Sequence, residues 1–585
     1  MTPQVGLPER YFGWLISLLL AILGLTQLFS VLGENQSADE AVHLSAGYSY
    51  LKTGDFRINP EHPPLGKYIN ALPLLLLNPH LPTEDPSWAD ADEYLFGRAF
   101  LYKNTESADK LLLYGRIPTI LMTLCLALAI GLWTRRHFNA ATALFAVLLF
   151  SFDPTVITHG RYVTSDIIVS LLIFLSITAW FRYLREPARG SLIRAGVLLG
   201  LTLCSKASGV ILLPMFAVLY LVAWWKKDLP APSWKQLTLA LGTCCVLGFL
   251  VIYAAYRFET SSVLADKALA KRFAMTSDEL KADIHVSSLL RRLIDPATTL
   301  GKVTHIAARY IPIPAHSFLH GIYWQADRNK QGRDYYLLGQ HSEKGRWYYF
   351  SVAFGVKTPV AVVLLLTICV VLVFWKFFSS LGNGLPALLR GIPLKWYALV
   401  IPMAVYLAAT LASNVNIGIR HLLPIYPFLY ILLSASFLTV DFGGSRKIRL
   451  AGALIIGAFT VAESAAAYPY YLPFFNVLAG GSAQGPRYLI DSNVDWGQDL
   501  KRLKTYTDSH GAKDLCLSYF GNVDPTYYGI VSRPLTEQAK SDTCDIAISV
   551  NALYSVETDN SWLHNKTPDA RIGYSIYYYD RNKLK

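Results

Sequence analysis

The chain has 585 residues, of which 53% are hydrophobic and only 16% are charged. Soluble globular proteins carry about 25% charged residues, so this composition excludes a water-soluble protein as well as the collagen, coiled-coil, disordered and small disulfide-rich classes. The 53 Lys and Arg residues outnumber the 41 Asp and Glu residues. These basic residues stand in short runs between apolar stretches, which is typical of membrane-protein loops and not of a nucleic-acid-binding surface.

Long apolar runs predict an α-helical membrane protein, because about 20 mostly apolar residues cross a bilayer. We expect about eleven spans, of which the third and the fifth are short. The first is too long for a cleaved signal peptide. The predicted spans are 12–32, 112–133, 139–152, 166–184, 192–204, 209–225, 236–256, 351–376, 396–412, 420–440 and 448–468.

Basic residues indicate the side of the membrane that each loop occupies, because cytoplasmic loops are enriched in Lys and Arg. Three long segments, about 33–110, 257–350 and 469–585, fall on the side opposite the basic runs. We therefore expect a multi-pass inner (plasma) membrane protein whose functional site and carboxyl terminus lie outside the cytoplasm. The basic runs that we assign to the cytoplasm are 135–137, 182–194, 225–227 and 446–449.

The last segment, 469–585, is polar enough to fold in water, and we predict a small α/β domain there, after a membrane domain at 1–468. Cys516 and Cys544 both lie in this segment, which is oxidising if it faces a bacterial periplasm. The two cysteines either pair or stay free, and their spacing alone does not decide between these. Alternation predicts strands at 515–520, 545–550 and 572–579, and helical spacing predicts a helix at 499–506.

Two adjacent carboxylates, Asp39 and Glu40, follow the first predicted span. A charge near hydrocarbon is costly unless it pairs with another charge or takes part in chemistry, which favours a functional interpretation. The alternative is a solvated helix start, where acidic residues are also favoured.

A second cluster lies some twenty residues further on, at Glu61, His62 and Lys67. The flanking prolines disfavour helix before them, so we expect Glu61 and His62 in a fixed extended segment. Lys67 then falls in the first turn of a short helix that we expect to lie on the membrane surface. The segment is either a Pro-capped interfacial helix or a place where an acid, an imidazole and an ammonium meet a lipid headgroup.

Three more clusters fall on the same face in this orientation. Arg161 and Asp166 stand at the entry to the fourth span, Lys206 stands between two apolar runs, and Arg420 with His421 begins the tenth span. Lys206 could merely extend to the membrane surface, and Arg420 could be an anchor at the membrane edge. Because all five clusters share one face, we expect one site to gather them.

These motifs together resemble the polyprenyl-phosphate-dependent glycosyltransferases of the GT-C type. This group includes the protein O-mannosyltransferases of glycosyltransferase family 39 and the aminoarabinose transferases that modify lipid A. The resemblance covers roughly residues 10–470. It implies a multi-span α-helical GT-C-like bundle with extracytoplasmic loops. The stretch 491–500 with 519–521 looks like members of family 39 of uncertain acceptor, and not like the repeat domain of eukaryotic O-mannosyltransferases.

The implied reaction is inverting transfer of a sugar from a polyprenyl-phosphate donor to an acceptor hydroxyl outside the cytoplasm. Its leaving group is a stable phosphate anion, so the enzyme needs cations for the phosphate and a base for the incoming hydroxyl. We expect Asp39 to be the base, with Glu40 or Asp166 positioning it or the sugar. The residues assigned to donor binding are Glu61, His62, Lys67, Arg161, Lys206, Arg420 and His421.

The sequence gives less information on metals, on the sugar and its acceptor, and on functions other than an enzyme. The carboxylates and His62 are suitable metal ligands, but their spacing is not diagnostic, and we expect no obligatory metal or other cofactor. The acceptor is open among a protein hydroxyl, lipid A, a wall polymer or another glycan, as is the sugar. Two alternatives to an enzyme are a non-catalytic envelope protein that binds glycans or lipids, and a transporter.

Overall fold

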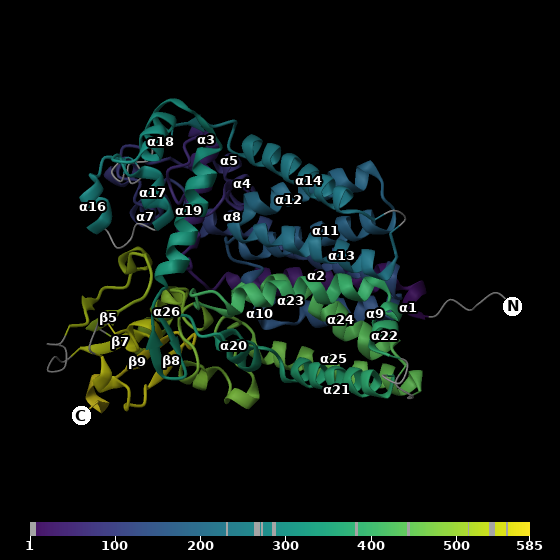
Figure 1. Ribbon diagram of the computed structural model, residues 1–585. Helices are drawn as coiled ribbons and strands as arrows, with labels where there is room; N and C mark the ends of the chain where they lie inside the picture. The colour runs from purple at the N-terminus through teal and green to yellow at the C-terminus, as the bar shows by residue number, and fades with distance from the viewer. Residues whose placement is uncertain are drawn as a thin grey trace.

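The structure is a computed structural model that describes residues 7–229, 232–262, 270, 273–282, 288–380, 384–441, 445–512, 514–536, 544–556 and 560–584. Long helices run roughly side by side through most of the molecule, and the carboxyl-terminal sheet lies beyond one end of them (Figure 1). The short loop helices gather at the same end. This end carries the three long segments at about 33–110, 257–350 and 469–585, which we call the first, second and carboxyl-terminal outer segments.

Within the described ranges, nine helices are long and apolar enough to cross a membrane. Each corresponds to one of the eleven predicted spans. They are α2 (Phe12–Val31), α8 (Ala108–His137), α11 (Asp166–Arg185), η1 with α13 (Ala207–Lys226), α14 (Trp234–Ala255), α21 (Val360–Ser380), α23 (Leu394–Leu411), η4 with α24 (Ile419–Thr439) and α25 (Arg446–Ala467).

The other two predicted spans form shorter helices. Helix α9 (Ala140–Ser151) has 12 residues and α12 (Arg189–Ser205) has 17. At 1.5 Å per residue they measure about 18 and 26 Å, less than the roughly 30 Å of bilayer hydrocarbon. Eleven expected spans thus correspond to nine full-length candidates and two shorter helices packed among them.

The first outer segment folds into short helices packed tightly on the bundle. Helix α4 (Pro64–Ala71) begins at Pro64, as the prolines predict, and Lys67 lies in its first turn. It crosses α3 (Glu40–Thr53) so closely that a Cβ on Gly47 would stand 2.2 Å from the backbone oxygen of Lys67. Lys67 is therefore buried. The other helices of this segment are α5 (Leu74–Leu77), α6 (Pro86–Ala89) and α7 (Glu93–Tyr102), whereas α10 (Pro154–His159) lies between α9 and α11.

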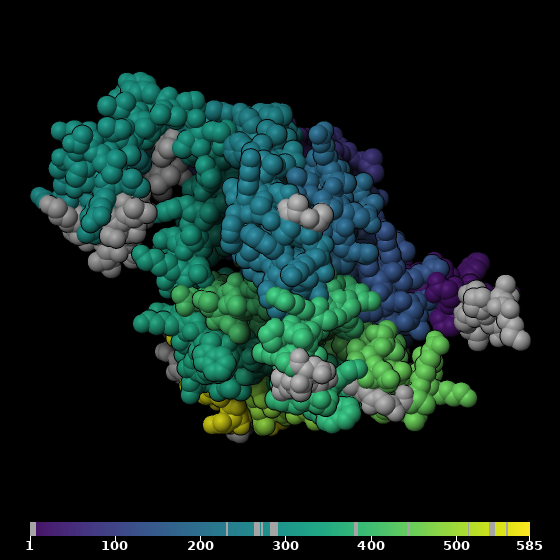
Figure 2. Space-filling view, turned by 45° about the vertical axis from the view of Figure 1, so that its right-hand side comes forward, coloured from purple at the N-terminus to yellow at the C-terminus, as the bar shows by residue number. Residues whose placement is uncertain are grey.

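The second outer segment contains helices and two small hairpins. Figure 2 shows its teal residues projecting at one end of the molecule. The strand pairs are β1 (Thr260–Ser261) with β2 (Ile313–Pro314), and β3 (Tyr335–Leu337) with β4 (Gln340–Ser342). The helices are α16 (Ser277–Ala282), α17 (Ser288–Ile294), α18 (Thr299–Tyr310), α19 (His316–Gln331) and α20 (Tyr349–Lys357); the remaining short helices of the bundle are α1 (Leu7–Arg10) and α22 (Leu385–Gly391).

The carboxyl-terminal segment forms a five-stranded mixed sheet in the order β6-β5-β7-β9-β8. Strand β5 pairs in parallel with β6 and β7, whereas β9 pairs antiparallel with β7 and β8. Helix α26 covers one face, where Leu500 and Leu503 pack against Leu515 and Leu517. The elements are α26 (Leu500–His510), β5 (Leu515–Ser518), β6 (Arg533–Pro534), β7 (Asp545–Ser549), α27 (Val550–Leu553), β8 (Ala570–Ile572) and β9 (Ile576–Tyr579).

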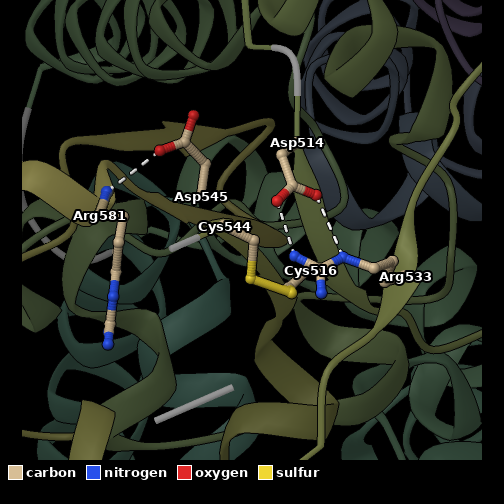
Figure 3. Close-up of a disulfide and its surroundings, with 6 residues drawn as sticks. All are labelled: Asp514, Cys516, Arg533, Cys544, Asp545 and Arg581. Carbon is tan, nitrogen blue, oxygen red and sulfur yellow. Dashed lines mark hydrogen bonds and ion pairs between the residues drawn. A yellow bond between two sulfur atoms is a disulfide. The ribbon is translucent and has the colours of Figure 1, made fainter. Parts of the chain in front are cut away.

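Two expectations for this segment are settled by the sheet. The run 572–579, expected as one strand, is a hairpin, because Gly573 and Tyr574 take left-handed backbone angles and reverse the chain. Cys516 on β5 and Cys544, just before β7, form a disulfide that ties the two parallel strands together (Figure 3).

Candidate functional site

Four of the predicted site residues form one chain of ion pairs. Nη1 of Arg420 lies 3.0 Å from Oδ2 of Asp39 and 3.9 Å from Oδ2 of Asp166. Oδ1 of Asp166 in turn lies 2.6 Å from Nζ of Lys206. Two carboxylates and two cations, up to 381 residues apart in the chain, therefore meet in one place.

Helix ends bring these four side chains together. Asp39 precedes α3, Asp166 is the first residue of α11, Lys206 follows α12, and Arg420 lies in η4. The side chain of Asp166 is 3% exposed and that of Asp39 is 30% exposed. Asp39 is thus the carboxylate that an incoming molecule can reach.

Trp496 forms the support on which Arg420 lies. The guanidinium carbon is 4.2 Å from the ring centre, close enough for a cation–π contact. The backbone oxygen of Trp496 also accepts a hydrogen bond of 2.8 Å from the N–H of Ala38, next to Asp39. Trp496 lies in the stretch 491–500 that resembles family 39, but it was not predicted to take part in the site.

Asn35 joins the same stretch to the loop before Asp39. Its side chain donates to the backbone oxygen of Gly497 at 2.6 Å and accepts from the N–H of Leu500 at 2.8 Å. The carboxyl-terminal segment therefore forms one side of the site, although it follows the last membrane helix.

Glu40 is fully buried and has a different environment from its neighbour Asp39. Arg116 holds it from two sides, with Nε to Oε1 at 2.8 Å and Nη2 to Oε2 at 2.6 Å. Its oxygens also accept from the backbone N–H groups of Ser37 and Val163. Glu40 therefore fixes the turn that carries Asp39 and has no oxygen left over for a substrate. Arg116 was not among the predicted residues.

Arg161 lies apart from the ion-pair chain. Its Nη2 is 2.9 Å from Oε1 of Glu34, and both side chains are buried. Tyr162 donates to Oε2 of Glu34, and Nη1 of Arg502 lies 3.5 Å from Oε1 of Glu34. Burial raises the pKa of Glu34, but Arg161 and Arg502 outweigh it and hold the pKa below its usual value. Nε and Nη1 of Arg161 are buried and have no acceptor among the described residues, so the expected contact of Arg161 with a donor phosphate stays a prediction.

The ammonium of Lys67 forms hydrogen bonds inside the protein. Its ammonium donates to the backbone oxygen of Asn59 at 2.5 Å and to the hydroxyl of Tyr50 at 3.0 Å. Burial lowers its pKa to about 7, against the opposing effect of Glu61 and Glu93. Glu61 also lies 3.7 Å from Arg328 of the second outer segment.

A narrow crevice lies between His43 and His62 and reaches Ser165, the residue before Asp166 of the ion-pair chain. His43 stands one helical turn after Asp39, and its ring centre is 5.0 Å from that of His62. Burial, and then Lys67, lower the pKa of His43 to about 4, so its imidazole is neutral at pH 7. His43 was missed as a site residue, although it ends the first acidic motif. The crevice is lined by His43, His62, Pro63, Gly66, Lys67, Asn70, Thr164 and Ser165.

Two further histidines lie close to the cations. His421 follows Arg420 and packs against Phe350 at 6.1 Å between ring centres. His159 packs edge-on against Trp496 at 5.9 Å, and burial lowers its pKa to about 3. Among the residues that the structure describes, no group of three His, Cys, Asp or Glu side chains is arranged to hold a metal ion.

Residues 108–252 match the family model described as dolichyl-phosphate-mannose-protein mannosyltransferase. No curated protein sequence matches the chain.

Three solved structures resemble the chain over most of its length. The protein O-mannosyltransferase Pmt1-Pmt2 complex of S. cerevisiae, bound to the sugar donor, has a TM-score of 0.53 at 11% identity, over 78% of this chain and 90% of that chain. ArnT from Cupriavidus metallidurans, bound to undecaprenyl phosphate, has a TM-score of 0.44 at 13% identity, over 98% and 99%. The oligosaccharyltransferase AglB from Archaeoglobus fulgidus has a TM-score of 0.46 at 13% identity, over 95% and 71%. The likeness to the Pmt1-Pmt2 complex confirms the predicted GT-C-like fold.

Proposed function

Because residues 108–252 match the family model described as dolichyl-phosphate-mannose-protein mannosyltransferase, we propose that the chain transfers a sugar from a polyprenyl-phosphate donor to an acceptor hydroxyl. The observation that carries this proposal is the ion-pair chain Asp39–Arg420–Asp166–Lys206. It supplies a reachable carboxylate beside two cations, which are the two kinds of group that this reaction needs.

In the proposed reaction the donor phosphate binds Arg420 and Lys206. Arg420 offers a flat fork of donors, and Lys206 a point charge. Because Arg420 contacts Asp39 directly, an incoming phosphate competes with Asp39 for the guanidinium and releases the carboxylate to act as a base.

The transfer itself is an in-line displacement with inversion at the anomeric carbon. The acceptor oxygen forms the new bond to this carbon while the bond to the phosphate oxygen breaks, and the bonding pair leaves with the phosphate. The acceptor proton passes to Asp39. General base catalysis of this kind contributes about 10²–10⁴-fold to a rate.

We place this reaction outside the cytoplasm of an inner (plasma) membrane. The disulfide between Cys516 and Cys544 suits an oxidising compartment, and the basic runs lie at the opposite ends of α8 and α11. In this arrangement residues 1–468 form the transferase domain and residues 469–585 an outer domain whose first part closes over the site.

The test uses purified full-length protein with a panel of polyprenyl-phosphate sugars, and it measures release of the polyprenyl phosphate. Asp39→Asn should reduce transfer at least 100-fold while donor binding persists, whereas Lys206→Gln should weaken donor binding. Asp55→Asn is the matched control, because Asp55 pairs with Arg57 elsewhere in the same outer segment. Full transfer by the Asp39→Asn protein with bound donor would disprove the base assignment. A transporter or a glycan-binding scaffold would show no donor cleavage with any sugar.

A further inference from the structure

A second pocket lies at the far ends of the helices that carry the site. It is formed where α8 and α11 end and α12 begins. Asp166 starts α11, and this 20-residue helix is about 30 Å long, so the pocket opens at the opposite face of the membrane bundle. The pocket encloses roughly 900 Å³ together with the open space at its mouth.

The pocket is strongly basic. Four arginines line it, Arg136, Arg182, Arg185 and Arg194, and Glu186 is the one carboxylate among its lining residues. Among the described residues, Glu186 forms an ion pair with Arg182 alone, at 3.9 Å. Within the described part of the chain, Arg136 and Arg194 contact no acidic partner and donate no hydrogen bond. Such a surplus of guanidinium groups, gathered in a concave place, favours an anionic ligand.

Other basic residues at this face are already satisfied by the chain. Arg135 lies 2.8 Å from Glu9, Lys226 donates to the backbone oxygen of Arg390, and Arg449 donates to that of Val440. The excess of cytoplasmic arginines expected of any membrane protein therefore does not by itself account for the unpaired charge in the pocket.

The wall of the pocket is aromatic and apolar. Trp133 packs against His137 at 4.5 Å and against Phe181 at 6.1 Å between ring centres. Its indole N–H is buried and has no acceptor among the described residues. Leu175 and Leu198 complete the apolar side. A ligand that matches this lining has an anionic head and an apolar tail.

We propose that the pocket binds the phosphate headgroup of an anionic phospholipid from the leaflet opposite the transferase site. The arginines hold the phosphate as forked donors, and the acyl chains lie along the apolar wall. Basic pockets between membrane helices on the cytoplasmic side are suited to such headgroups. The binding site stands on its own geometry; only its assignment to the cytoplasmic leaflet rests on the orientation proposed above.

The test measures lipid binding by native mass spectrometry of the delipidated full-length protein. The probe is dioleoyl phosphatidylglycerol, and the variant is Arg136→Gln with Arg194→Gln. The matched control is Arg135→Gln with Arg189→Gln, which removes the same charge from the same two helices outside the pocket. We expect the pocket variant to raise the apparent Kd at least ten-fold, and the control to match the wild type.

Two further arms identify the ligand. Dioleoyl phosphatidylcholine should not occupy the site, and excess inorganic phosphate should not displace phosphatidylglycerol. Equal phosphatidylglycerol binding by the pocket variant and the control, equal binding of the zwitterionic lipid, or full displacement by inorganic phosphate would each overturn the proposal. If the double variant does not fold, Arg194→Gln alone should raise the Kd about three-fold, and unchanged binding would count against the site.

Discussion

Arg420 lies with its guanidinium 4.2 Å above the ring of Trp496, which joins the membrane part of the site to the segment that follows the last membrane helix. The same arginine reaches Asp39 with Nη1. The position of one cation thus depends on an aromatic ring in one segment and a carboxylate in another. Packing of the carboxyl-terminal segment on the bundle is therefore a condition for the geometry of the site.

Replacement of Arg420 should impair transfer more than folding. Arg420→Ala removes a donor to the departing phosphate, and the loss of one such donor costs about 10²–10³-fold in rate. Arg420→Lys keeps the charge but loses the fork of donors, so it should retain an intermediate rate. Single-turnover release of polyprenyl phosphate measures both. Arg98→Ala, which removes an exposed arginine paired with Asp524, is the control, and an equal loss there would contradict a specific role.

Two substitutions of Trp496 should separate support of Arg420 from general packing. Trp496→Ala empties a fully buried site and should cost about 3–5 kcal/mol of unfolding free energy. Trp496→Phe keeps a ring under the guanidinium but weakens the cation–π contact by about 1 kcal/mol. It should raise the KM for the donor about five-fold and lower the free energy of unfolding by less than Trp496→Ala does. Wild-type KM in the Phe variant would show that the ring does not act through Arg420.

Predictions from the sequence succeeded where one physical constraint dominates. A bilayer sets the minimum length of a spanning helix, so nine apolar runs could be placed from composition alone. Runs 139–152 and 192–204 gave helices of only 12 and 17 residues, although the second of these helices runs from the basic pocket to Lys206 in the ion-pair chain. The run 572–579 was predicted as one strand because its alternating pattern continues across Gly573, although the chain turns back there.

The site could be predicted only in part, because its residues come together from distant parts of the chain. Charges near a membrane can be found from sequence, but which carboxylate reaches which cation cannot. Arg116 lies 76 residues from Glu40, and Arg161 lies 127 residues from Glu34. The pairing of Arg161 with Glu34 through Nη2 therefore could not be predicted from the sequence. His43 could have been found, because it stands four residues after Asp39 on a helix.

The buried pair of Glu40 and Arg116 should behave as a structural unit. Glu40→Gln leaves a buried guanidinium without its counter-charge, and breaking such a pair costs about 3–5 kcal/mol. Adding Arg116→Met should recover part of that stability, and a double-mutant cycle of thermal unfolding in detergent measures the coupling. A Glu40→Gln protein that is as stable as the wild type but inactive would instead assign Glu40 to the substrate.

The disulfide can be detected by counting the free thiols of the chain. Of the seven cysteines in the chain, Cys516 and Cys544 are bonded to each other, so a maleimide should label five thiols in denatured, unreduced protein and seven after reduction. Replacing both residues with Ser opens a loop closed over 28 residues and should cost about 3–4 kcal/mol. Seven labelled thiols before reduction, in protein isolated from its native membrane, would place this segment in a reducing compartment.

Asp495 should make stability depend on pH. Burial raises the pKa of this carboxyl to about 7, although the N–H groups of Gly497 and Asn551 bond to it. The folded protein then binds a proton that the unfolded chain loses above its ordinary pKa of about 3.9. The contribution of Asp495 to the free energy of unfolding is therefore fully present below about pH 3.9. It falls as pH rises from there to about 7, by up to about 4 kcal/mol in total.

Asp495→Asn mimics the protonated acid and should remove this part of the pH dependence. Its Tm relative to wild type should therefore rise steadily between pH 5 and about 7 and then level off, because above that pH the wild-type carboxyl is ionised in both states. Differential scanning calorimetry of the full chain in detergent follows the difference. Asp514→Asn, at an exposed carboxylate paired with Arg533 (Figure 3), should give a curve parallel to wild type. A parallel curve for Asp495→Asn as well would mean that Asp495 is ionised in the folded protein throughout this range.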